Sequence, residues 1–110
     1  MYYEEDVVLC VSNAYEKKYY LNEDFNGLPD HIKNELKAMC VLFTEDVGGI
    51  LMLKYDENGT LQFETEAAEE DILYDEIGAV LKIKQLRNEK TDLLQSLELY
   101  FKVFFLDEDV

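Results

Sequence analysis

The last third of this chain has the residue content of a helix over almost its whole length. Residues 69–105 contain no proline and one glycine, and they open on acidic side chains, which the positive end of a helix dipole favours. A single straight helix over this range would be on the order of 55 Å long. The core of a 110-residue domain cannot cover that length, so we expect another surface to contact part of it.

The apolar positions in this segment form two stripes. The earlier stripe consists of Leu73, Ile77, Val80 and Leu81, and the later one of Leu86, Leu93, Leu97, Tyr100, Phe101 and Phe104. At about 100° per residue the stripes lie roughly a third of a turn apart, with the change of phase near 82–84. The pattern predicts a long helix that kinks or breaks there, or a straight one whose halves pack against different neighbours.

The later stripe has the alternating four- and three-residue spacing of a helix packed against other helices. It fits either the core of the chain itself or the seam of a homodimer. The apolar area exceeds what a small sheet and one other helix are expected to cover, and a twofold dimer is the commonest solution. The interface candidates are Leu93, Leu97, Tyr100, Phe101 and Phe104.

The remaining elements are shorter. Residues 7–11 and 15–21 read as two strands, although the second could equally be helical. A helix is predicted after Pro29, with a stop at Gly48 and Gly49. The run at 38–43 is apolar on all sides, so a strand that starts near 39 is the alternative to a deeply buried helix.

A β-hairpin is the clearest local signal. Residues 50–55 and 60–65 flank a turn that contains Asn58 and Gly59, which predicts a type I′ turn with positive φ at the glycine. The first strand is apolar on both faces and should be central, whereas the second alternates with polar residues and should lie nearer an edge.

Together these elements give the order strand, strand, helix, strand, strand, helix (ββαββα). We predict a single α+β domain over residues 1–110, with an antiparallel sheet and a long C-terminal helix.

The chain is strongly acidic, with 25 acidic and 10 basic residues and a formal net charge of −15. This balance argues against binding to nucleic acid or to an anionic membrane, and it suits a basic protein partner. The acidic first residues do not resemble a secretory signal, and no run approaches the ~20 apolar residues of a membrane span. Cys10 and Cys40 lie in apolar runs without metal-ligand spacing, as buried reduced thiols do. We therefore expect a cytoplasmic protein.

Acidic side chains are concentrated between Lys54 and Lys82, a stretch without any basic residue. Three interpretations remain open: a solvated face, which is the commonest, a surface for a basic protein, and a metal site. For the third, Asp71 and Asp75 would share one helix face and hold a hard cation such as Mg²⁺.

Catalytic patterns are largely missing. His31 is the one histidine and has no partner visible in the sequence, and no nucleophile elbow, phosphate loop or dinucleotide fingerprint occurs. We expect a protein that is not an enzyme and uses no cofactor.

Four segments are similar to those of a family of short, acidic, uncharacterised bacterial proteins, a domain of unknown function. They are Asn-Ala-Tyr-Glu-Lys-Lys-Tyr-Tyr (13–20), Cys-Val-Leu-Phe-Thr-Glu-Asp-Val-Gly-Gly (40–49), Leu-Tyr-Asp-Glu-Ile-Gly (73–78) and Ser-Leu-Glu-Leu-Tyr-Phe-Lys-Val-Phe-Phe (96–105). The resemblance covers almost the whole chain and implies no activity and no site residue.

The sequence favours a non-enzymatic protein-interaction module that self-associates as a homodimer. The alternative is a small acidic chaperone or inhibitor that masks a basic target surface, including one that mimics the charge of nucleic acid. A metal-dependent activity at the acidic cluster is the third possibility.

Overall fold

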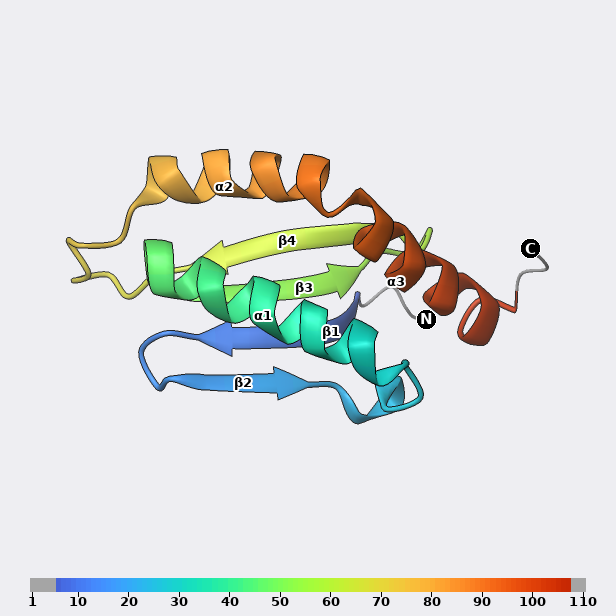
Figure 1. The fold of residues 1–110 in the computed structure, drawn as a ribbon. Helices are drawn as coiled ribbons and strands as arrows, with labels where there is room; N and C mark the ends of the chain where they lie inside the picture. The colour runs from blue at the N-terminus through green and yellow to red at the C-terminus, as the bar shows by residue number, and fades with distance from the viewer. Residues whose placement is uncertain (1–5, 108–110) are drawn as a thin grey trace.

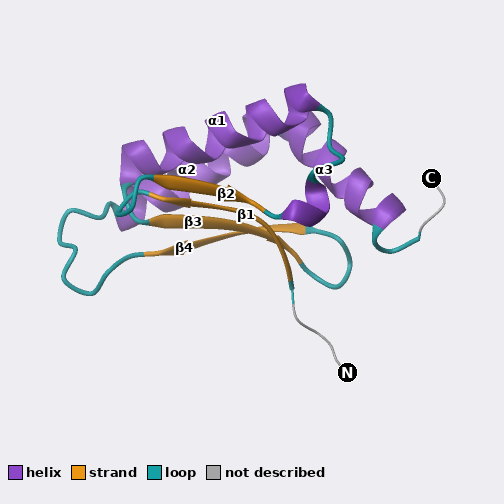
Figure 2. Cartoon of the chain, turned by 90° about the horizontal axis from the view of Figure 1, so that it is seen from below, coloured by secondary structure: helices purple, strands orange, loops and turns teal. Residues whose placement is uncertain are grey.

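The computed structural model describes residues 6–107, so the acidic start at 1–5 lies outside the described residues. Four strands form an antiparallel sheet in the order β2-β1-β3-β4 (Figure 1). Helices α1 and α2 lie on one face of this sheet, and α3 continues past its end (Figure 2). The prediction of an α+β fold with an antiparallel sheet is confirmed. The elements are β1 (Val7–Asn13), β2 (Lys18–Leu21), a 3₁₀ turn η1 (Glu23–Phe25), α1 (Asp30–Val47), β3 (Ile50–Tyr55), β4 (Leu61–Glu66), α2 (Glu76–Glu89) and α3 (Thr91–Phe104).

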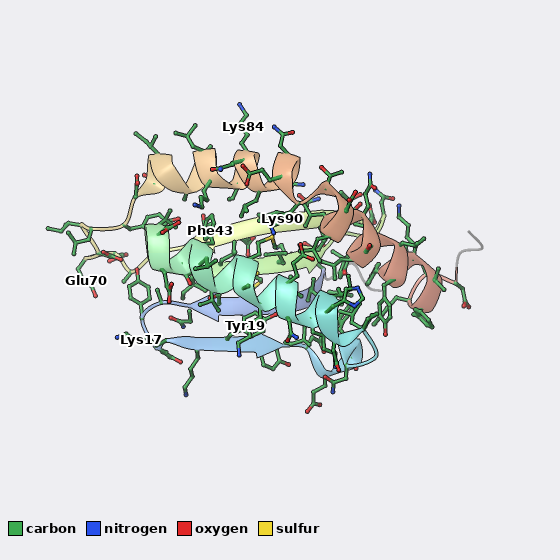
Figure 3. The ribbon with its side chains drawn as sticks, in the orientation of Figure 1. Lys17, Tyr19, Phe43, Glu70, Lys84 and Lys90 are labelled. Atoms are coloured by element: carbon green, nitrogen blue, oxygen red, sulfur yellow. The ribbon has the colours of Figure 1, made fainter. Side chains whose placement is uncertain are left out.

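The core forms where α1 packs on the two central strands. Every second residue of β3 is fully buried beneath the helices, as its alternation requires. The buried face of α1 recurs at helical spacing, and Phe43 in Figure 3 points toward the sheet. Residues 38–43 are therefore helical, and the alternative strand is wrong. The buried residues of α1 are Leu36, Met39, Cys40, Phe43, Thr44 and Val47.

The predicted hairpin is confirmed as β3 and β4, with β3 central and β4 at the edge. Its turn differs from the prediction. Only Gly59 has positive φ, at 81°, so this is not a type I′ turn, which needs two such residues. The Gly59 N–H donates to the Asp56 carbonyl, and the Asp56 N–H donates to the Thr60 carbonyl. This is a tight turn followed by a glycine bulge.

The predicted helix over 69–105 is interrupted, as one of the two alternatives allowed, but the predicted position of the break near 82–84 is wrong. Within this range the structure has two helices, and they meet at Lys90. Residues 67–75 form a loop, and α2 begins only after it. The Asp75 carboxylate caps the first turn of α2 by accepting the Gly78 N–H at 2.8 Å. The order of the main elements is consequently ββαββαα.

The break at Lys90 allows α3 to turn its apolar stripe toward the core. The Thr91 hydroxyl donates to the carbonyls of Arg87 and Asn88 and so satisfies groups at the end of α2. Beyond the break, Phe101 stacks on Tyr55 with ring centroids 4.1 Å apart, and the Tyr55 hydroxyl donates to the Leu97 carbonyl. The end of the sheet is therefore closed by aromatic side chains of this chain.

Candidate interaction surface

The loop between β4 and α2 is fixed at several points. The Tyr15 hydroxyl donates to the Asp71 carboxylate at 2.6 Å and accepts the Ala68 N–H at 2.9 Å. Near the other end, the Asp75 N–H donates to the Val47 carbonyl. The ring of Tyr74 packs so closely on Gly49 that a Cβ there would lie 2.7 Å from it. Contacts on both sides of residues 72 and 73 therefore fix the conformation of the loop.

The two metal candidates, Asp71 and Asp75, take part in this anchoring. Asp71 lies in the loop and Asp75 caps α2, so they do not share a helix face as predicted. The reason is that helix begins only at Glu76. Within residues 6–107 no group of three or more His, Cys, Asp or Glu side chains is placed to hold a metal ion.

Between and beyond the anchors, the chain presents large apolar side chains to solvent. We define the α2 outer surface as Ile72, Leu73, Ile77, Val80 and Leu81, whose exposed fractions are 92%, 88%, 76%, 62% and 60%. Its helical members, together with Lys84, follow the i, i+3, i+4, i+7 spacing of one helix face. Lys84 points away from the sheet and from α1 (Figure 3). This face is therefore directed outward.

The core side of α2 is narrower, with Ala79 and Leu86 buried and Ile83 partly buried. The helix is thus apolar on both sides, and the sequence alone did not indicate which side faces the core. The earlier apolar stripe predicted from the sequence contained four of the five residues of this surface, but the prediction did not say that they would be exposed. Ile72 was missed, because residue 72 was taken as part of a helix.

The structure buries three of the five residues predicted as an interface on α3. Leu93, Leu97 and Phe101 are at most 3% exposed and belong to the core of the chain. They are unavailable to a second copy because α3 turns inward after Lys90. Tyr100 is half-buried, and Phe104 is 68% exposed.

The α2 outer surface has ends of opposite charge. Exposed Glu69, Glu70 and Glu76 lie at its N-terminal end, and Glu70 extends from the loop in Figure 3. Lys84 lies toward its C-terminal end. Helix α2 carries three basic and two acidic residues, Lys82, Lys84 and Arg87 against Glu76 and Glu89, in a chain that is otherwise strongly acidic.

The histidine and the two cysteines noted in the sequence lie away from the α2 outer surface. His31 is exposed at the start of α1, beside a groove of about 390 Å³ that α1 and α3 form. Cys10 and Cys40 are buried free thiols whose sulfurs lie 3.7 Å apart. In the part of the chain that the structure describes, no helix is both long and apolar enough to cross a membrane.

Comparison of the chain with curated proteins and with solved structures gave no match. A family model does match, over residues 6–109. The resemblance noted in the sequence is thereby confirmed at the level of the family. The chain belongs to a family of unknown function (DUF6145).

Proposed function

We propose that this protein is a non-enzymatic, cytoplasmic protein-interaction module that forms a symmetric homodimer through the α2 outer surface. The observation that carries the proposal is the exposure of Ile72 and Leu73 on a loop that Tyr15 and Tyr74 hold in place. Large apolar side chains that are exposed on a held segment are typical of interaction sites. The free thiols of Cys10 and Cys40 fit a reducing compartment.

A second copy suits this surface because of its charge. A twofold axis would pair the two α2 helices in antiparallel orientation, so that each surface contacts itself. Glu76 of one copy would then approach Lys84 of the other, and the arrangement would repeat by symmetry. The distance along the helix between these residues is about 12 Å. Ile77, Val80 and Leu81 lie between them and would pack between the two ion pairs.

The first experiment changes one apolar residue of the surface. Leu81→Glu should weaken the dimer about tenfold or more, because it places charge in a desolvated contact, and the monomer should remain folded. Leu99→Glu is the matched control, since Leu99 is 48% exposed but lies on α3. Sedimentation equilibrium gives the dissociation constants. A wild-type protein that stays monomeric at high micromolar concentration would refute the homodimer.

The second experiment tests the orientation. Lys84→Glu and Glu76→Lys should each weaken the dimer about two- to tenfold, because each creates like-charge contacts in both symmetric pairs. Combined in one chain, the two changes should restore most of the affinity. A double variant that is weaker than either single variant would exclude the antiparallel pairing.

The alternative function is a chaperone or inhibitor that masks a basic protein. It is supported by the exposed acidic side chains that follow one another from the edge strand into the loop, Glu64, Glu66, Glu69 and Glu70. This surface would repel nucleic acid and anionic membranes. A pull-down at low salt with the wild-type chain and with Glu66→Gln/Glu69→Gln/Glu70→Gln tests it, because only the wild type should retain a basic partner.

A further inference from the structure

A pocket of about 630 Å³ lies between the β1–β2 hairpin and α1. Helix α1 packs on β1 and β3, and strand β2 extends beyond it at the edge of the sheet (Figure 1). The pocket occupies the space that this offset leaves. Its walls come from Ser12, Asn13, Ala14, Lys17, Lys18, Tyr19, Lys37, Val41, Thr44 and Glu45.

The charge of the pocket is opposite to that of the molecule. Lys17, Lys18 and Lys37 line it against a single carboxylate, Glu45, which leaves a surplus of two positive charges. Three of the ten basic residues of a chain with net charge −15 are thus gathered at one site. Lys17 lies in the turn of the β1–β2 hairpin, Lys18 begins β2, and Lys37 lies on α1, so the tertiary fold brings them together. Figure 3 shows Lys17 at the turn and Tyr19 on β2 beside α1.

One of these lysines is held in an unfavourable conformation. Lys17 has φ of 56°, in the left-handed region where glycine or asparagine is favoured. The turn itself is stabilised by the Asn13 side-chain oxygen, which accepts the N–H groups of Tyr15 and Glu16. Glycine at 17 would adopt this conformation with less strain.

The other walls are suited to an apolar or aromatic group. The ring of Tyr19 is half-buried, and the Lys37 ammonium lies 6.0 Å from its centroid. Val41 adds an aliphatic wall. The hydroxyls of Ser12 and Thr44 also line the pocket, and they lie 2.9 Å apart in a hydrogen bond.

We propose that this pocket binds a small phosphate monoester whose organic group is apolar or aromatic. The dianionic phosphate matches the surplus of two positive charges, and lysine binds phosphate as a point charge. The organic group would lie against Tyr19 and Val41. This site is independent of the α2 outer surface and of the proposed dimer.

The test is a ¹H–¹⁵N NMR titration of the full chain with phenyl phosphate, with inorganic phosphate and potassium chloride at matched ionic strength as comparisons. Phenyl phosphate should give saturable shifts confined to amides of residues 12–19 and 37–45. Inorganic phosphate should bind the same amides more weakly, because it lacks the ring, and chloride should leave them unchanged. Equal, unsaturable shifts with all three salts would overturn the proposal.

The variant Lys17→Gln/Lys18→Gln/Lys37→Gln should weaken phenyl phosphate binding about tenfold or more, because charge-assisted hydrogen bonds are lost. Lys102→Gln is the matched control, since Lys102 lies on α3 at the opposite end of the fold (Figure 1). The dispersion of each variant's spectrum shows whether it is folded. Unchanged binding in a folded triple variant would also overturn the proposal. If the triple variant is unfolded, the single change Lys37→Gln on the exposed side of α1 replaces it, with a loss of about threefold or more expected.

Discussion

At the scale of single residues, the turn between β3 and β4 shows how few groups define a backbone path. Gly59 has φ of 81°, and a Cβ there would lie 3.2–3.3 Å from Lys102, Leu106 and Phe101. Asp56 completes the turn, because its carboxylate accepts the N–H groups of Thr60 and Asn58 and the side chain of Gln62. The positive φ of Gly59 and the hydrogen bonds to Asp56 therefore both stabilise this turn.

Gly59→Val should destabilise the protein by about 1–3 kcal/mol, because the left-handed conformation is strained for a β-branched residue. The crowding against α3 adds to the cost. Chemical denaturation measures the change. Glu57→Val is the control, since residue 57 is exposed and does not have positive φ. Equal stability of the two variants would contradict this account of the turn.

Asp56 should make stability depend on acid pH. Hydrogen bonds from the Thr60 N–H, then from Asn58 and Gln62, lower its pKa from the usual 3.8. Since the folded state has the lower pKa, the contribution is present above pH 3.8 and is lost as the pH falls through the folded value. Melting temperatures of the wild type and Asp56→Asn should therefore converge on acidification. A difference that is constant from pH 6 to pH 2 would exclude this linkage.

At the scale of elements, the loop before α2 depends on the distant hairpin turn. Tyr15→Phe removes the hydroxyl that binds both Ala68 and Asp71. Amide hydrogen exchange at residues 67–75 should speed up about five- to tenfold, since about 1 kcal/mol of hydrogen bonding is lost. Tyr20→Phe is the control, as Tyr20 is exposed on β2 and forms none of these bonds. Unchanged exchange in Tyr15→Phe would show that the loop is held without it.

Helix α3 carries both buried and exposed apolar side chains, so substitutions on it should differ sharply in their effect on stability. Leu97 is fully buried, whereas Phe104 is 68% exposed and packs at a tilt against Tyr100, with ring centroids 4.6 Å apart. Leu97→Glu should cost more than about 4 kcal/mol and unfold most molecules. Phe104→Glu should cost about 1 kcal/mol or less. Circular dichroism and melting curves separate the outcomes. A folded, monomeric Leu97→Glu would contradict the assignment of Leu97 to the core and favour the predicted α3 dimer seam.

At the scale of the whole molecule, the net charge of −15 acts on every association. Two copies repel each other at long range, and salt reduces this repulsion because the screening length shortens to about 10 Å at 0.1 M. The exposed ion pairs of the proposed dimer contribute less, since each is worth about 1 kcal/mol or less. Binding to a basic partner has the opposite dependence, because there the long-range force is attractive.

The homodimer should therefore become tighter as sodium chloride rises from about 20 mM to 300 mM. Sedimentation at several salt concentrations measures the trend. A complex with a basic protein should instead weaken over the same range, so the sign of the salt dependence separates the two proposed functions. Self-association that weakens steeply with salt would indicate that ion pairs, rather than apolar contacts, dominate the interface.

Local patterns in the sequence were sufficient to predict much of the fold. Asn58 and Gly59 between alternating strands predicted the β3–β4 hairpin, and Pro29 with Gly48 delimited α1. These signals work because they concern neighbours in the chain, whose geometry is set by backbone sterics and side-chain period. The α+β class followed from the order of such elements, and the family membership followed from the residues themselves.

Only the tertiary structure decided what each apolar stripe contacts. A stripe on α2 or α3 has the same period whether it faces the core, a partner or water, so burial of Leu97 and exposure of Ile77 could not be read from spacing. The helix start at Glu76 depends on how the preceding loop is held, and the loop is held by Tyr15, which lies 56 positions before its partner Asp71. The lysine pocket likewise joins Lys17 to Lys37 across two elements. These features depend on contacts distant in sequence, which local periodicity does not encode.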